Sequence, residues 1–161
     1  EETQEKRYLI NHFLENFRGT LFRQTMFAEF EAAAHRKAQE GETLTASALG
    51  ELYHKLNEDY FGPEMVVDPE IDYEWERIPH FYTPFYVYQY ATGFSAAVAI
   101  SSRILSGDET ALAGYKKFLQ GGCSLPPIDL LKLCGVDMST TKPVDEALKV
   151  FGELLEEFCR L

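Results

Sequence analysis

Apolar residues recur every three or four positions along much of this chain, and this spacing constrains the fold more than any other feature. From Thr3 to about Gln39 it predicts one long amphipathic helix that ends at Gly41. The apolar positions of this helix are Leu9, Phe13, Phe17, Leu21, Phe27 and Phe30. No stretch shows the alternation of apolar and polar residues that is typical of a strand. The sequence therefore predicts an all-α fold.

Helix caps and helix breakers predict the remaining elements. Thr45 and Asp108 are suitable N-caps, and Pro143 suits the first turn of a last helix. The expected helices cover about residues 45–62, 84–105, 108–120, 127–134 and 143–158. Between residues 64 and 79 the periodicity fails, which predicts a structured loop anchored by Trp75. We expect residues 1–161 to form a single segment of about six helices.

Composition and charge restrict the classes of function. A length of 161 residues suits one domain, and a hydrophobic content of 45% supports a packed core. The formal net charge of −11 would repel a phosphate backbone or an anionic membrane, so neither partner is expected. No apolar run reaches the roughly 18 residues that a membrane span needs.

The cysteines indicate the cellular compartment, and the first residues indicate whether the chain is part of a longer protein. Cys123, Cys134 and Cys159 are odd in number and share no Cys-x-x-Cys spacing. They predict reduced, mostly buried thiols in a cytoplasmic protein. The chain begins with Glu-Glu-Thr, in a helical pattern and without Met, which predicts a piece of a longer protein.

The segment from Ile78 to Gly93 is the richest in groups that can do chemistry. Its sixteen positions hold one histidine, four tyrosines and two phenylalanines. Thr83-Pro84 predicts a helix start, with His80 and Tyr82 in the approach to the helix. Tyr86 then falls in the first turn, and Tyr90 follows one turn later on the same face. Such donors can stabilise an oxyanion, but aromatic packing in a core explains the same residues.

Metal-ligand patterns are weak. The chain contains no His-Glu-x-x-His motif. His12 with Glu15, and Glu31 with His35, each place an imidazole and a carboxylate on one helix face. Such isolated pairs are common, and solvated surface pairs are the favoured explanation of both. The polar neighbours of His54 predict an exposed side chain.

Two arginines lie among aromatic residues in the first helical pattern. Arg18 and Arg23 could bind a substrate carboxylate with two parallel hydrogen bonds. The alternative is that each pairs with a structural glutamate.

Three motifs carry a family resemblance. Residues 17–31 read Phe-Arg-Gly-Thr-Leu-Phe-Arg-Gln-Thr-Met-Phe-Ala-Glu-Phe-Glu, and residues 78–93 read Ile-Pro-His-Phe-Tyr-Thr-Pro-Phe-Tyr-Val-Tyr-Gln-Tyr-Ala-Thr-Gly. Residues 119–138 read Leu-Gln-Gly-Gly-Cys-Ser-Leu-Pro-Pro-Ile-Asp-Leu-Leu-Lys-Leu-Cys-Gly-Val-Asp-Met. With these motifs the chain resembles, over essentially its whole length, the oligoendopeptidase F group of the thimet-oligopeptidase-like zinc peptidases.

The resemblance implies a helical enzyme with a deep channel that admits short peptides. In that family a His-Glu-x-x-His helix and a later glutamate hold zinc. Those motifs lie upstream in the family and are absent here, so this chain is expected to supply no metal ligand. The resemblance assigns His80 and Tyr86 as catalytic residues that donate to the oxyanion. It assigns Tyr82 and Tyr90 as substrate-binding neighbours.

We therefore expect a C-terminal segment of a zinc oligoendopeptidase that is inactive by itself. Its partners would be short peptides and the missing N-terminal part of the same enzyme. The face that meets that part is expected to be apolar and exposed, and to allow a dimer. The alternative is a free-standing helical interaction module that binds a partner through the tyrosine-rich turn. The upstream coding sequence distinguishes the two, because only the peptidase requires a His-Glu-x-x-His motif there.

Overall fold

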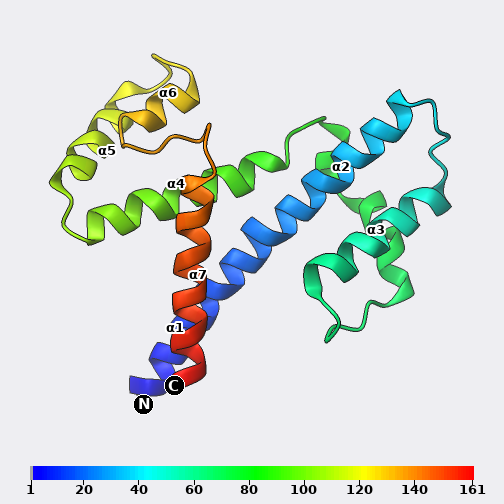
Figure 1. Ribbon diagram of the computed structural model, residues 1–161, viewed down its shortest axis with the longest axis horizontal. Coiled ribbons are helices and arrows are strands. Elements are labelled where there is room, and N and C mark those ends of the chain that lie inside the picture. Colours follow the sequence, from blue (N-terminus) through cyan, green and yellow to red (C-terminus); the bar gives the residue numbers. More distant parts are fainter. Residues whose placement is uncertain (1) are drawn as a thin grey trace. The chain divides into compact units, whose positions relative to one another are not determined.

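The computed structural model describes residues 2–161 and confirms the all-α prediction (Figure 1). Within these residues there are seven α-helices and no strand. They are α1 (Glu2–Asn16), α2 (Arg23–Gln39), α3 (Ala46–Phe61), α4 (Tyr88–Leu105), α5 (Glu109–Gly121), α6 (Pro127–Lys132) and α7 (Lys142–Arg160). The single long helix expected from Thr3 to Gln39 is interrupted by a π-helical segment, Phe17–Phe22.

The chain divides into two compact units. The central unit is Arg18–Ala91, and the terminal unit combines the residues up to Phe17 with Thr92–Leu161. The central unit contains residues 78–91 of the aromatic segment that the sequence singled out.

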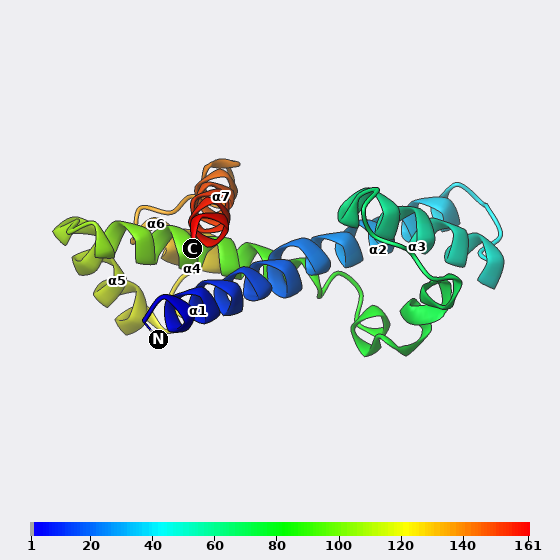
Figure 2. The same ribbon diagram turned by 90° about the horizontal axis from the view of Figure 1, so that it is seen from below.

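The central unit is built on α2 and α3, which lie side by side in both views (Figure 1, Figure 2). As predicted, Thr45 caps α3, since its hydroxyl accepts a hydrogen bond from the N–H of Ala48 at 3.1 Å. The expected loop contains a 3₁₀ helix, Pro69–Arg77, that packs on α3. Trp75 anchors this helix in the core, with its ring 6.1 Å from that of Phe30. The buried core consists of Met26, Phe27, Phe30, Tyr53, Leu56, Ile78 and Val87.

The terminal unit pairs α1 with α7 (Figure 1). Lys6 forms an ion pair with Glu157, and Phe17 packs edge-on against Phe94 at 4.9 Å. A second core joins α4 to the region after α6. It consists of Ala96, Ala99, Ile100, Cys134 and Val136.

One helix cap and one arginine connect the elements around this second core. Asp108 caps α5 as predicted, by accepting a hydrogen bond from the N–H of Ala111 at 3.0 Å. Arg103 donates both to Asp108 and to the carbonyl of Cys134. Of the three cysteines only Cys134 is buried, so the expectation of mostly buried thiols is wrong.

Gly114 of α5 lies against the backbone that follows α6. A Cβ atom at this position would overlap the carbonyl oxygen of Leu133. We expect Gly114→Ala to lower the free energy of unfolding by about 2 kcal/mol, because backbone atoms cannot move aside as a side chain can. Gly152 of α7 has open space around its Cβ position, so Gly152→Ala should raise stability slightly. Urea denaturation of both variants checks the contrast, and equal effects would contradict the close approach.

Candidate functional site

The aromatic segment is held at both ends by buried apolar side chains. Ile78 and Val87 are both part of the central core. Between them the chain forms a short 3₁₀ helix, Pro79–Tyr82, and then a tight turn. Because its two ends are fixed in the core, the polar aromatic side chains between them are displayed at the surface.

His80, Tyr86 and Tyr90 form one cluster on this surface. The rings of His80 and Tyr86 are stacked, with centroids 5.5 Å apart and planes inclined by 3°. Tyr90 lies edge-on to both rings, at 5.6 Å from His80 and 5.4 Å from Tyr86. Its hydroxyl is 3.3 Å from Nε2 of His80 and donates to the hydroxyl of Tyr86 at 3.2 Å. The structure thus brings together three of the four residues that the sequence singled out.

The cluster is polar and accessible. Tyr86 and Tyr90 are 38% and 37% exposed, so a ligand can reach both phenols. The hydrogen bond to Tyr86 raises the pKa of the Tyr90 phenol above its ordinary value of 10.0. Tyr90 is therefore protonated at neutral pH and acts as a hydrogen-bond donor.

Tyr82 lies apart from the cluster. Its side chain is 79% exposed, and its hydroxyl is 3.5 Å from the carbonyl oxygen of Glu76. It lies in the same 3₁₀ helix as His80, Pro79–Tyr82.

The predicted helix start at Thr83-Pro84 is wrong, because α4 begins at Tyr88. Phe85 has a φ of 58°, which lies in the left-handed region and interrupts any right-handed helix. After this turn the N–H of Tyr90 donates to the carbonyl of Val87 at 3.2 Å. Tyr86 and Tyr90 are still in contact, although Tyr86 precedes the helix.

Arg23 pairs with a structural glutamate, which was one of the two predictions for it. Its Nη2 atom lies 2.6 Å from Oε1 of Glu74, which also accepts a hydrogen bond from the Tyr53 hydroxyl at 2.7 Å on its other oxygen. Arg18 lines a surface hollow of about 620 Å³ in the same unit, together with Arg77. The sequence did not predict Glu74 as the partner, because it lies 51 residues from Arg23.

The weak metal-ligand patterns do not form a metal centre. His54 is partly buried rather than exposed, because its Nδ1 atom contacts Oδ1 of Asp72 at 2.6 Å. Glu31 is buried, which corrects the surface-pair reading of Glu31 and His35. His12 is exposed as expected for a surface pair. Across residues 2–161 no three His, Cys, Asp or Glu side chains gather to hold a metal ion, so these residues do not fit a zinc site.

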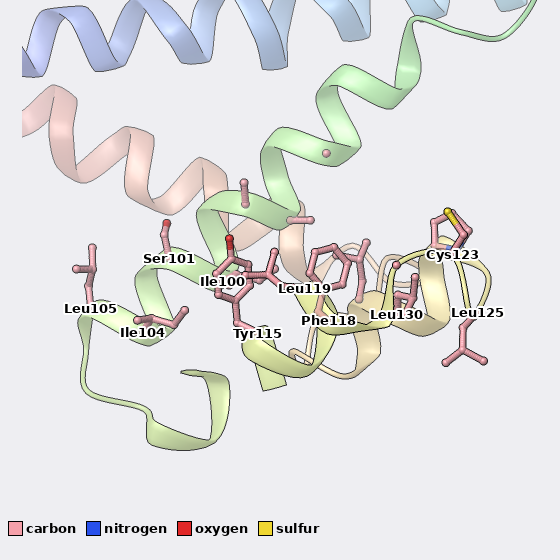
Figure 3. A pocket seen from close by; sticks show the side chains of 16 residues that line it. Ile100, Ser101, Ile104, Leu105, Tyr115, Phe118, Leu119, Cys123, Leu125 and Leu130 are labelled. Carbon is pink, nitrogen blue, oxygen red and sulfur yellow. The ribbon is translucent and has the colours of Figure 1, made fainter. Parts of the chain in front are cut away.

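A second hollow, in the terminal unit, has a different character. It measures about 1050 Å³ and is lined by α4, α5 and the segment that leads into α6 (Figure 3). Ile100, Tyr115, Phe118 and Leu130 are among its lining residues. The lining is almost entirely apolar, so this hollow offers a surface for packing rather than groups for catalysis.

Comparison with known proteins decides the family. The sequence profile of peptidase family M3 matches residues 1–150. The chain belongs to peptidase family M3. The resemblance to oligoendopeptidase F is confirmed, since this M3 chain is 55% identical over 157 residues to oligopeptidase PepF of Bacillus subtilis. It is 45% identical over 160 residues to the chromosomal oligoendopeptidase F of Lactococcus lactis subsp. cremoris.

A solved structure shows the same fold. The M3 chain aligns with the crystal structure of oligoendopeptidase-F from Enterococcus faecium with a TM-score of 0.94 and 44% sequence identity. That alignment covers 96% of this chain and 30% of the other. The matches to the Bacillus and Lactococcus proteins cover 98% and 99% of this chain, and 23% and 27% of those relatives. This M3 chain thus spans about a quarter of the length of its curated relatives. Within residues 2–161, no helix combines the length and the apolar character that crossing a membrane requires.

Proposed function

We propose that this M3 chain is part of a zinc-dependent oligoendopeptidase that hydrolyses short peptides in the cytoplasm. In this proposal the cluster of His80, Tyr86 and Tyr90 binds the peptide and stabilises the oxyanion of the tetrahedral intermediate. The observation that carries the proposal is the cluster itself, in which an imidazole and two phenols lie in mutual contact at an accessible surface. Family membership supplies the class of reaction.

The hydrogen bonds suggest an order of donors. In this proposal the Nε2–H tautomer of His80 donates to the oxygen of Tyr90, and the Tyr90 hydroxyl donates to the oxygen of Tyr86. This arrangement leaves the O–H of Tyr86 free to donate to a ligand. Hydrogen bonds in such a chain polarise one another, which strengthens the last donor. Tyr86 is therefore the donor that we assign to the oxyanion.

Stacking on His80 prepares the Tyr86 ring for this role. A phenol that is already oriented need not reorganise when negative charge develops, and preorganised donors of this kind lower the barrier most. Tyr82, exposed on the same turn, would contact the peptide beside the scissile bond. Tyr90 would hold Tyr86 in place and contact the peptide as well.

The zinc ion would be held by residues that are not part of this chain. When bound, zinc in such an enzyme activates a water molecule and polarises the peptide carbonyl. The residues of this chain bind the peptide and place hydrogen-bond donors beside its carbonyl. The partners of the chain are accordingly short peptides and the remaining part of the peptidase.

The apolar hollow of the terminal unit supports this view of the partner. Leu105, Leu119 and Leu125 line it and are 86%, 61% and 47% exposed. Exposed apolar surface of this kind is unusual unless another surface covers it. We propose that the remaining part of the peptidase packs there, and that the chain by itself tends to dimerise through the same face.

Peptide cleavage tests the proposed function. A complete peptidase that contains these 161 residues should cleave a fluorogenic peptide of about eight residues, lose activity with a chelator and regain it with zinc. The 161-residue chain alone, with zinc added, should not cleave it, because its residues do not fit a zinc site. Zinc-dependent cleavage by the chain alone, or an inactive complete protein, would contradict the proposal.

A further inference from the structure

The backbone immediately before Tyr86 adopts a conformation that phenylalanine rarely accepts. Phe85 has a φ of 58°, and among residues 2–161 it is the only non-glycine residue with a positive φ. In this region the Cβ atom of a bulky residue crowds its own backbone, so such residues persist only where neighbouring groups hold them. The contacts around Phe85 identify those groups.

Glu31 holds the backbone of Phe85. One carboxylate oxygen of Glu31 accepts a hydrogen bond from the Phe85 N–H at 2.7 Å. The Glu31 side chain is only 5% exposed, and within residues 2–161 it forms no ion pair. A buried carboxylate without a basic partner is costly unless hydrogen bonds compensate it. The hydrogen bond from the Phe85 N–H therefore helps to compensate the cost of burying the Glu31 carboxylate.

His35 holds the ring of the same residue. It lies one helical turn after Glu31 on α2, and its ring is 4.8 Å from that of Phe85, inclined by 34°. One face of α2 thus contacts both the backbone and the side chain of Phe85. These are the two residues whose spacing resembled a metal-ligand pair in the sequence.

The conformation of Phe85 determines where Tyr86 lies, because the two residues share a peptide unit. The left-handed residue lies between the 3₁₀ helix that carries His80 and the helix α4 that carries Tyr90. We propose that Glu31 is a positioning residue for the tyrosine cluster. Its carboxylate holds Phe85 in the left-handed conformation and thereby sets the Tyr86 phenol against His80 and Tyr90. The catalytic consequence rests on the proposed function, but the positioning itself does not.

Fluorine NMR on the 161-residue chain tests the positioning directly. With 3-fluorotyrosine at position 86, the unmodified chain should give one signal shifted by the stacked His80 ring. Glu31→Leu removes the acceptor, so the signal should move to the position of an exposed fluorotyrosine or broaden. Glu31→Gln keeps an acceptor oxygen and should retain the original signal. The matched control is Glu29→Leu, since Glu29 lies on the same helix but accepts its hydrogen bond from Tyr60.

A second background separates positioning from a general structural role. Asparagine tolerates the left-handed region better than phenylalanine does. In a Phe85→Asn background, Glu31→Leu should therefore change the Tyr86 signal much less than in the original chain. If Glu31→Leu leaves the signal unchanged, or disturbs it equally in both backgrounds, the positioning role is wrong. Loss of folding in Glu31→Leu, together with an altered Tyr86 signal in folded Glu31→Gln, would also overturn it.

Steady-state kinetics of a complete peptidase tests whether Glu31 also affects catalysis. Glu31→Leu should lower kcat about tenfold with little change in KM, and Glu31→Gln should recover most of the loss. If Tyr86→Phe has no effect in the same enzyme, the proposed function fails while the fluorine result still decides the role of Glu31. If Tyr86→Phe lowers kcat and Glu31→Leu does not, the positioning inference fails while the proposed function stands.

Discussion

Replacing Tyr86 by phenylalanine in a complete peptidase that contains this chain should lower kcat by about 10²-fold, with little change in KM. The variant keeps the ring that stacks on His80 and removes only the hydroxyl. A donor that acts on developing negative charge contributes mainly in the transition state, so its loss lowers kcat rather than substrate affinity. Steady-state kinetics with a fluorogenic peptide measures both constants.

The control for this variant is Tyr60→Phe. The Tyr60 hydroxyl also forms a hydrogen bond, to Glu29 at 2.9 Å, but it lies outside the cluster. Its removal should leave kcat unchanged and so corrects for any general effect of losing a phenol. Unchanged turnover in Tyr86→Phe would remove Tyr86 from the mechanism and leave the cluster with an aromatic packing role.

Replacing Glu74 by alanine should lower the free energy of unfolding by about 4 kcal/mol, the largest stability effect that we expect for a single substitution. Glu74 is 7% exposed and joins three elements of the central unit. It accepts hydrogen bonds from Arg23 of α2, from Tyr53 of α3 and from Arg77 of its own 3₁₀ helix. Its removal leaves a partly buried guanidinium and a buried phenol without their acceptor. Urea denaturation of the 161-residue chain measures the loss.

The same carboxylate should make stability depend on pH. Burial by itself raises the pKa of Glu74, but the hydrogen bonds from Tyr53 and Arg23 and the charges of Arg23 and Arg77 outweigh it, so its pKa lies below the ordinary value of 4.5. A carboxyl with a lowered pKa in the folded state stabilises the fold fully above its unfolded pKa. This contribution is lost as the pH falls through the lowered pKa of Glu74 in the folded state. We therefore expect Glu74→Gln to flatten the decline in stability below about pH 4.5.

Glu42→Gln is the matched control for both measurements. Glu42 forms an ion pair with Lys37 at 2.7 Å in the same unit, but this pair is exposed to solvent. Exposed ion pairs contribute little to stability because water screens them. An effect of Glu42→Gln as large as that of Glu74→Ala would show that simple loss of negative charge, rather than the buried network, explains the result.

Local sequence signals predicted most of the fold. The spacing of apolar residues identified the helices, and Thr45 and Asp108 cap the helices that they were expected to cap. These features depend on residues a few positions apart, so the order of residues is enough to predict them. The aromatic segment and its family resemblance were also visible in the sequence, together with the donors His80, Tyr86 and Tyr90.

The arrangement of those donors was decided by contacts between distant parts of the chain. Thr83-Pro84 is a good local helix start, yet α4 begins at Tyr88 because Phe85 is left-handed. The carboxylate that holds Phe85 comes from Glu31, 54 residues earlier, and no local pattern links the two. Likewise, Glu74 meets Arg23 only once the 3₁₀ helix packs in the central unit.

The sequence by itself determined that this chain is helical and that it belongs with the oligoendopeptidases, and it singled out the polar aromatic side chains of the segment after Ile78. Only the tertiary structure decided where α4 begins and how the rings of His80, Tyr86 and Tyr90 contact one another. The physical reason is that the left-handed conformation of Phe85 is locally unfavourable, so the neighbouring residues by themselves do not predict it. The hydrogen bond from the Phe85 N–H to Glu31 on a distant helix compensates this cost, and that contact exists only after folding.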